Sequence, residues 1–381
     1  MSKGMVMKVF PGANTSRGFY SLYNYIIPQD STRIFVIKGG PGVGKSTFMK
    51  KICANIISRG FRAEWHCCSS DNGSVDGVVF PQLGIAMIDG TAPHIVDPKN
   101  PGAVDEIIHL GDYWNEPLLR QSKQDILVIN RRVGRLFGIA YFALQEAMAA
   151  MNEWKSYISE AQNWPIVNSM FADTWAELMG QIEPRYDRSP VDRHLFAWAI
   201  SPQGKVNFID SLMQGVEVLY LVEGKPGSGK SSFIGNFGGR AMEQGVDVEF
   251  YHNTLNPDDI DGIILRSQGI ALFTAEGPFA WMPDDYQGLL KRIDLSVELN
   301  PDVINLYAQE IKDAEARFNQ HMARAISHIA QAKEAHDRME TYYVPAMDFA
   351  AIEQKRLEIE QRILGYADEL AKAASTWGSK I

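Results

Sequence analysis

The amino-acid sequence predicts an α/β protein made of two duplicated domains, each with a parallel, doubly wound sheet that is followed by a long helical hairpin. Three observations lead to this fold class: a glycine-rich motif that occurs twice, a register of matching residues around both copies, and a strand–loop–helix order in each half. We expect the two halves to cover residues 1–190 and 191–381.

The glycine-rich motif reads GGPGVGKS at residues 39–46 and GKPGSGKS at residues 224–231. Both copies fit G-x-x-x-x-G-K-[ST], the pattern of a phosphate-binding loop or P-loop. Glycines let successive backbone N–H groups converge on a phosphate, and the helix that follows adds its positive N-terminal end. Each half is therefore expected to hold a phosphate group at this loop.

The register around the two loops is ungapped when the chain is shifted by 185 positions. Residues 39–98 then align with residues 224–283, and 16 of the 60 pairs are identical. Identities continue far beyond the motif, for example at 84–86 and 269–271, so two chance motif matches cannot explain them. The sequence indicates a duplicated domain.

Upstream of the loops the two copies match loosely. Residues 10–18 (FPGANTSRG) pair with residues 196–204 (FAWAISPQG) after small changes in length. The boundary between the halves then falls near residue 190, inside the polar, proline-containing stretch 183–194.

Apolar and glycine patterns predict the elements of each half. In the first half, strands are expected at 33–38, 63–68 and 84–89, and the helix after the loop should end at Gly60. The second half repeats this order, with strands expected at 218–223, 248–253 and 269–274 and a helix end at Gly245. This order is typical of a parallel sheet that binds its ligand at the carboxyl ends of the strands.

A long helical stretch is expected after each core, over residues 117–179 and from residue 301 onward, with a break near Val344 and Pro345. A seven-residue spacing predicts a helical hairpin or short coiled coil, and it involves Ile304, Ile311, Phe318, Ala325 and Ala332, with Tyr307 and Ala314 between them. These helices could simply pack, or they could form a lid or an arm for self-association or for a protein partner.

Composition narrows the class of protein. Hydrophobic residues make up 45% and charged residues 22% of the 381 residues, and the formal net charge is -9. No basic footprint is visible, so we expect no nucleic-acid partner. Residues 1–12 lack a long apolar core and no run of about 18 apolar residues occurs, so neither a signal peptide nor a membrane span is expected. Three cysteines in an odd pattern suit a reducing, cytoplasmic compartment.

The motif assigns roles to individual residues. Lys45 should bridge the β- and γ-phosphates, and Ser46 should ligate magnesium, as should Ser231 in the second copy. The expected nucleotide-binding residues are Gly39, Gly40, Pro41, Gly42, Val43, Gly44, Lys45, Ser46 and Thr47, and Gly224, Lys225, Pro226, Gly227, Ser228, Gly229, Lys230, Ser231 and Ser232. Because no N-K-x-D motif marks guanine specificity, we expect ATP with Mg²⁺.

A magnesium-holding carboxylate should end a neighbouring apolar strand, and Asp89 fits that description. The alternative is that Asp89 only caps the loop after it. The register places Thr274 opposite Asp89, and Glu276, two residues later, could substitute. This asymmetry predicts a catalytic first half, with Lys45 and Asp89 as catalytic residues, and a divergent or regulatory second half.

Other residues near the expected site leave alternatives open. Gly90, and no glutamate, follows Asp89, which argues against fast hydrolysis. Asp76 and Asp261 could act as a base, as an outer-shell magnesium ligand or as part of an Asp-Gly turn. The run His66-Cys67-Cys68 is more suited to lining an acceptor pocket than to binding a metal, because consecutive strand residues point to opposite faces.

An additional cation is expected to offset charge during phosphoryl transfer. Arg17 and the helical cluster Arg131, Arg132 and Arg135 are candidates, and the opposite half could also supply an arginine. Spacing does not decide among these sources.

The runs KGGPGVGKSTFMKK, HCCSSDNGSVDGVV and IDGTAPHIVDPKNPGAVDE, followed by EGKPGSGKSS, resemble a functionally uncharacterised bacterial family of tandem P-loop ATPase or nucleotide-kinase-like proteins. The resemblance covers nearly the whole chain and implies a cytosolic P-loop protein with nucleotide at both loops. It supplies no substrate. Three functions therefore stay open: an ATPase, a small-molecule or nucleotide kinase that uses ATP, and a nucleotide-gated scaffold without turnover.

Overall fold

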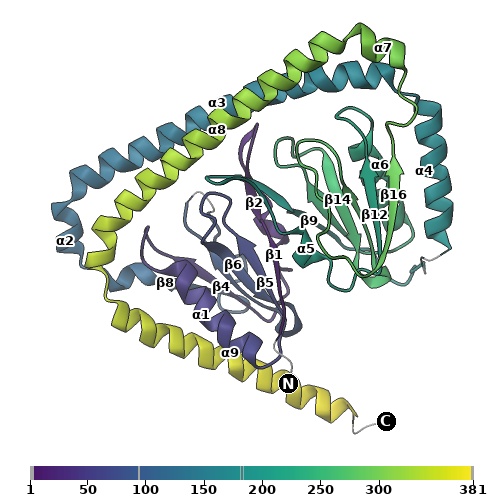
Figure 1. The fold of residues 1–381 in the computed structure, drawn as a ribbon. Coiled ribbons are helices and arrows are strands. Elements are labelled where there is room, and N and C mark those ends of the chain that lie inside the picture. The colour runs from purple at the N-terminus through teal and green to yellow at the C-terminus, as the bar shows by residue number, and fades with distance from the viewer. Residues whose placement is uncertain (1–3, 93–94, 181, 183, 379–381) are drawn as a thin grey trace. The chain divides into compact units, whose positions relative to one another are not determined.

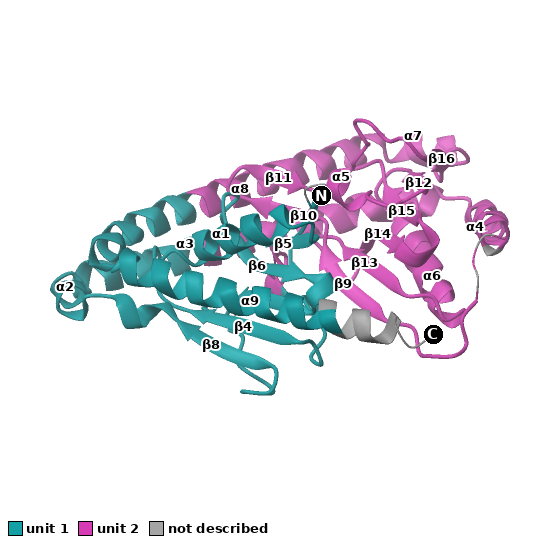
Figure 2. Ribbon diagram, turned by 90° about the horizontal axis from the view of Figure 1, so that it is seen from below, with its two compact units in different colours: residues 1–11, 21–136, 331–381 teal, residues 12–20, 137–330 magenta. Residues whose placement is uncertain are grey.

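The computed structural model describes residues 4–92, 95–180, 182 and 184–378. The chain divides into two compact units (Figure 2): unit 1 contains residues 1–11, 21–136 and 331–381, and unit 2 contains residues 12–20 and 137–330. The boundary expected near residue 190 stays a prediction, and each compact unit contains segments from both sides of it.

Unit 1 is built on a six-stranded sheet with the order β1-β5-β6-β7-β4-β8. Its strands are β1 (Val6–Val9), β4 (Arg33–Lys38), β5 (Ala63–Cys67), β6 (Val75–Phe80), β7 (Ile85–Asp89) and β8 (Asp105–His109). The strands expected at 33–38, 63–68 and 84–89 are thus confirmed to within one residue.

Unit 2 repeats this sheet with the order β16-β12-β15-β14-β13-β9. Its strands are β9 (Asp192–Phe196), β12 (Val218–Glu223), β13 (Val248–His252), β14 (Ile260–Leu265), β15 (Ile270–Thr274) and β16 (Leu289–Asp294). Equivalent strands occupy equivalent places, so the duplication inferred from the register is also present in the fold.

The expectation of purely parallel sheets is wrong, because each sheet contains one antiparallel strand. β6 runs antiparallel to both β5 and β7, and β14 runs antiparallel to both β13 and β15. The Asp-Gly pairs inside these strands suggested turns, yet Asp76 and Asp261 are buried within the sheets. The turn interpretation of these aspartates is therefore also wrong.

A 14-residue helix follows each glycine loop, α1 (Lys45–Ser58) in unit 1 and α6 (Lys230–Glu243) in unit 2. Both end as expected, since Gly60 and Gly245 follow with positive φ angles of 94° and 78°. In this left-handed region a β-carbon would be strained, so glycine terminates these helices.

The helical arms are exchanged between the repeats. Helix α9 (Phe349–Gly378), which follows the second sheet in the chain, packs against α1 in unit 1 and adds Ile352, Ile359 and Ile363 to its core. Helix α4 (Trp164–Met179), which follows the first sheet, packs against α6 in unit 2 through Val167 and Leu178. Figure 1 shows α9 beside α1 and α4 beside α6.

The expected hairpin within each half is replaced by a pairing between halves. Within unit 2, α3 (Lys123–Ala161) and α8 (Ala308–Tyr343) run antiparallel, with Trp154 against Phe318 and Tyr157 against Tyr307. The heptad positions serve this pairing, since Phe318 and Ala325 are buried. The expected break near Val344 and Pro345 is confirmed, and the short helices α2 (Glu116–Gln121) and α7 (Pro301–Leu306) precede the long ones.

The loosely matched segments upstream of the loops both fold into β-hairpins in unit 2. They are β2 (Gly12–Thr15) with β3 (Gly18–Ser21), and β10 (Trp198–Ser201) with β11 (Gly204–Asn207). The amide of Asn14 donates to the carbonyl oxygen of Ile200 at 3.0 Å, which joins the two hairpins. The one-turn helix α5 (Ile209–Leu212) follows. Across the described part of the chain, no helix is long and apolar enough to cross a membrane.

Candidate functional site

The 18 residues expected to bind nucleotide form two equivalent strand–loop–helix connections, from β4 to α1 and from β12 to α6. Gly42 and Gly44 have φ angles of 66° and 87°, and Gly227 and Gly229 have φ angles of 95° and 98°. Gly44 and Gly229 are the N-cap residues of the two helices. Each loop therefore turns its backbone into the positive end of a 14-residue helix.

The loop lysines lie over their own loops. The Lys45 ammonium donates to the carbonyl oxygens of Gly39 and Gly40 at 3.1 and 2.9 Å. Lys230 donates in the same way to the carbonyl oxygens of Gly224 and Lys225. Both ammonium groups thus stand where an anion held by the loop would meet them.

Asp89 ends β7, next to β4 in the sheet, and the structure brings it to Lys45. Its Oδ2 lies 3.6 Å from the Lys45 ammonium, and its Oδ1 accepts a hydrogen bond from the Thr91 backbone at 2.8 Å. Burial raises the pKa of Asp89 above its usual value, and Lys45 opposes that shift. Asp89 therefore makes both contacts that were considered as alternatives: it caps the loop that follows β7, and it faces the lysine of the glycine loop.

The loop serines also occupy equivalent places. The Ser46 hydroxyl oxygen accepts a hydrogen bond from the Val75 amide at 3.1 Å, and the Ser231 oxygen accepts one from the Ile260 amide at 2.6 Å. These contacts join the start of each helix to the antiparallel strand that the sequence pattern missed.

Magnesium fits the donors of the first loop. Over the described residues no group of three or more His, Cys, Asp or Glu side chains could hold a metal ion. Magnesium beside a polyphosphate needs only one or two protein oxygens, because phosphates and waters complete its shell. Ser46 and Asp89 are such oxygen donors.

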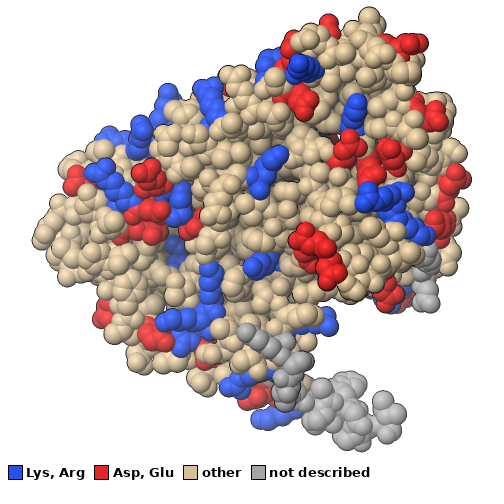
Figure 3. Space-filling view, in the orientation of Figure 1, with Lys and Arg blue, Asp and Glu red and all other residues tan. Residues whose placement is uncertain are grey.

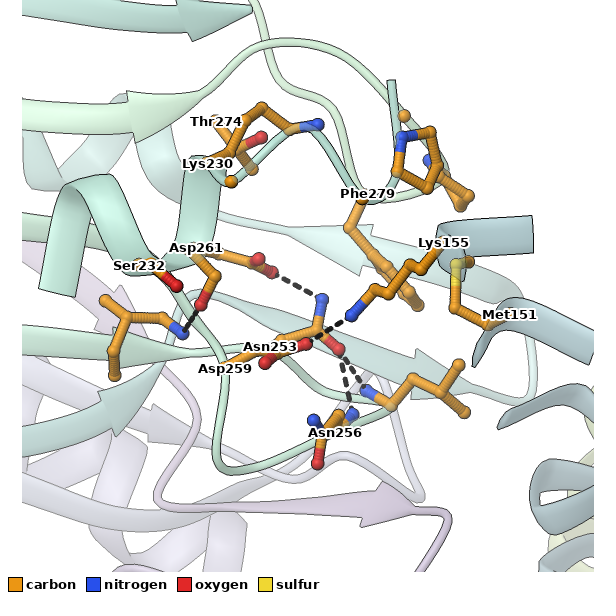
Figure 4. A pocket seen from close by; sticks show the side chains of 18 of the residues that line it. Met151, Lys155, Lys230, Ser232, Asn253, Asn256, Asp259, Asp261, Thr274 and Phe279 are labelled. Carbon is orange, nitrogen blue, oxygen red and sulfur yellow. Dashed lines mark hydrogen bonds and ion pairs between the residues drawn. The ribbon is translucent and has the colours of Figure 1, made fainter. Parts of the chain in front are cut away.

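The second loop borders a cavity of about 310 Å³ within unit 2 (Figure 4). Thr274 and Glu276 both line it. The Glu276 carboxylate accepts a hydrogen bond from the Gly224 amide at 2.8 Å, whereas at the equivalent position of the first loop Thr91 donates to Gly39 at 3.0 Å. Glu276 thus takes the place of Thr91, and no carboxylate stands where Asp89 does in unit 1.

Polar residues that the sequence did not single out complete this cavity. Lys155 of α3 reaches Asp259 at 2.5 Å, and the Asn253 amide donates to Asp261 at 2.9 Å (Figure 4). Asn253 is equivalent to Cys68 in the 185-residue register. This equivalence was the only feature of the sequence that could have identified Asn253 as a site residue. Nothing in the local sequence marks Lys155, because it lies about 70 residues before the loop that it contacts.

Asp76 and Asp261 are buried carboxylic acids, one in each unit. Burial raises the pKa of Asp76 to about 6 and that of Asp261 to about 7, although the Asn253 hydrogen bond lowers the second value somewhat. Tyr23 and Cys68 stabilise ionised Asp76 in the corresponding way. The roles of Asp76 and Asp261 as a base or as an outer-shell magnesium ligand stay predictions.

The raised pKa of Asp261 makes stability depend on pH. From the unfolded value of 3.8 to about 7, the folded state holds a proton that the unfolded state has lost, so stability falls as pH rises through this window. Asp261→Asn, which keeps an acceptor for Asn253, should therefore be more stable than the wild type at pH 8, by up to about 4 kcal/mol. Denaturant unfolding at pH 4, 6 and 8 measures this difference, and Asp76→Asn should give a smaller effect with a midpoint near 6. A difference that is constant with pH would contradict the assignment.

The other candidates are placed as follows. Arg17 forms an exposed ion pair with Asp258 in unit 2, and Arg131, Arg132 and Arg135 are exposed on α3. His66 and Cys67 are buried in β5. Residues 93 and 94, within the run IDGTAPHIVDPKNPGAVDE, lie outside the described residues.

No family model, no curated protein and no solved structure matches this chain.

Proposed function

We propose that this protein is a tandem P-loop NTPase that binds ATP with magnesium at both loops and hydrolyses it slowly at the first. The observation that carries the proposal is the contact at 3.6 Å between the Asp89 carboxylate and Lys45 at the start of α1, where Ser46 is the next residue. A lysine and a carboxylate at this place are what phosphoryl transfer on a P-loop requires.

Different residues at the first loop would bind the phosphates and the magnesium ion. The loop amides and Lys45 bind the phosphate oxygens, and Lys45 offsets the charge that develops during transfer. Ser46 and Asp89 would hold magnesium, which supplies further charge neutralisation when bound. Asp76 is buried near Lys45, and its raised pKa suits a group that accepts a proton from water or from an acceptor hydroxyl.

The second loop has the binding elements without the carboxylate of Asp89. Thr274 occupies the position equivalent to Asp89, and the Glu276 carboxylate accepts a hydrogen bond from the Gly224 amide. We therefore assign binding without appreciable hydrolysis to the second half. On the face seen in Figure 3, acidic and basic side chains are interspersed and do not form a continuous basic patch of the kind that binds nucleic acid.

A kinase remains the second candidate, favoured by the buried Asp76 beside the loop and by Gly90 in place of a glutamate. A kinase needs an acceptor hydroxyl, and Asp76 could accept its proton. The two functions differ in one measurable respect, since a kinase releases ADP only when its acceptor is present. A nucleotide-gated scaffold would release none.

Titration calorimetry of the full chain with ATP and magnesium tests the proposal. We expect two ATP molecules per wild-type chain, one for Lys45→Ala, one for Lys230→Ala and none for the double variant. The single variants control for each other, because they occupy equivalent positions of the two repeats. Absence of ATP binding to the wild type would refute the proposal. If ATP binds but an assay of ADP release detects no product, the protein would instead be assigned as a kinase or a scaffold.

A further inference from the structure

The helical arms approach the two loops in the same way, although each arm belongs to the other copy of the repeat. In unit 2, a β-carbon added at Gly229 would lie 2.9 Å from the Trp164 ring, and in unit 1 one added at Gly44 would lie 3.6 Å from the Phe349 ring. Trp164 and Phe349 are 185 positions apart, as are the two glycines. The repeat therefore extends into the arms that cover the loops.

Backbone hydrogen bonds confirm this extended register. Asn115 donates to the carbonyl oxygen of Ala346 at 2.7 Å in unit 1, and Asn300 donates to that of Ala161 at 2.8 Å in unit 2. Both pairs are again 185 positions apart, 115 with 300 and 161 with 346. Positions on the two arms can therefore be compared one by one.

At equivalent positions of the two arms, a residue beside the middle of each loop differs in charge. A β-carbon at Gly227 would lie 2.3 Å from the carbonyl oxygen of Lys155, and one at Gly42 would lie 3.1 Å from the Val344 side chain and 3.2 Å from the β-carbon of Glu340. Lys155 and Glu340 are equivalent in the register, since 155 + 185 = 340. The second loop thus meets a lysine where the first loop meets a glutamate.

Lys155 points into the cavity of the second loop (Figure 4). Its ammonium is paired with Asp259 at 2.5 Å, and both side chains are partly exposed, at 33% and 26%. An ion pair with this exposure contributes little to stability, so the ammonium can leave the carboxylate for a phosphate at small cost. Lys230 lines the same cavity. A polyphosphate bound in this cavity would therefore meet two ammonium groups.

The first loop lacks this arrangement. Glu340 is paired with His336 on its own helix at 3.5 Å. Lys333 lies two turns before Glu340 on α8, about 10 Å away along the helix axis. Asp71 and Asp337 hold its ammonium. Glu340, whose β-carbon lies beside Gly42, adds a negative charge near this loop, which would repel phosphates and increase the need for a metal ion.

We infer that Lys155 is a triphosphate-binding residue of the second loop, and that this loop binds ATP more tightly, and with less need for magnesium, than the first loop, where Glu340 takes the equivalent place. This inference rests on the proposed function and specifies the second site within it. The arm lysine partly replaces the metal that the missing carboxylate would have helped to hold.

Calorimetry with ATP on the full chain tests this inference in two backgrounds, with excess magnesium and with EDTA. Lys45→Ala leaves only the second loop, where Lys155→Met should weaken ATP binding at least tenfold, most strongly in EDTA, and Lys155→Arg should retain it. Lys230→Ala leaves only the first loop, where Glu340→Lys should strengthen binding in EDTA at least tenfold and Glu340→Gln should give an intermediate value.

A variant with the opposite sign excludes misfolding as the cause. Asp259→Asn frees Lys155 from its carboxylate and should tighten ATP binding at the second loop, which damage to the fold cannot do. Two bound ATP molecules per wild-type chain, together with Lys155→Met binding within twofold of its parent, would overturn the inference and leave the proposed function intact. Absence of ATP binding to the wild type would overturn both.

Discussion

Replacing Asp89 with asparagine should reduce magnesium-dependent ATP turnover by at least about a hundredfold, while ATP still binds. Asparagine keeps the oxygen that accepts the Thr91 hydrogen bond, so the loop after β7 should retain its conformation. What the variant loses is the negative charge that faces Lys45 at 3.6 Å and that would hold magnesium. Steady-state phosphate release across a magnesium titration, with calorimetry for binding, measures both properties.

Equivalent positions of the second repeat provide the controls for this experiment. Thr274→Ala should leave turnover unchanged, since Thr274 stands where Asp89 does in the register. Lys45→Ala should abolish turnover, whereas Lys230→Ala should leave most of it. Full turnover in Asp89→Asn would show that Asp89 is only a loop cap, and equal losses in the two lysine variants would show that the halves depend on each other.

Introducing a charge at Ile359 should detach α9 from unit 1. Ile359 is fully buried against the core that α1 shares with the sheet, although it follows the entire second sheet in the chain. An aspartate there loses the isoleucine packing and buries a carboxylate, which together cost on the order of 5 kcal/mol. Hydrogen exchange should then lose protection in α1, residues 45–58, while α6 of unit 2 keeps its protection.

Leu357→Asp is the matched control, because Leu357 lies on the same helix with 38% of its surface exposed. It should leave exchange in α1 as in the wild type. Faster exchange in α6 and unchanged exchange in α1 after Ile359→Asp would show that α9 stabilises the unit formed by its own repeat.

Much of each domain core could be predicted from sequence, because its signals are local. The strands at 33–38 and 218–223, the glycine loops and the helix ends at Gly60 and Gly245 all depend on residues within a few positions of one another. The match between residues 39–98 and 224–283 gave further support to these predictions, because the same pattern occurs in both copies. For this reason the expected loop residues form the two strand–loop–helix connections.

The errors arose where a long-range partner overrides a local signal. Asp76-Gly77 has the composition of a turn, yet the pairing of β6 with β5 and β7 extends it into a buried strand. The heptad pattern of α8 predicted a partner helix without identifying it, because apolar positions specify an interface and not its other side. Lys155 could not be predicted as a site residue for the same reason, since only the tertiary fold brings α3 to the second loop.

The exchange of α4 and α9 also has a consequence for biogenesis. A ribosome delivers residues 4–136 before any of residues 349–378, so the first sheet and α1 emerge with the apolar face that Ile352, Ile359 and Ile363 later cover still open to solvent. The second sheet, by contrast, finds α4 already synthesised. The repeat that is translated first is therefore completed last, because the helix that covers its core follows the whole second sheet in the chain.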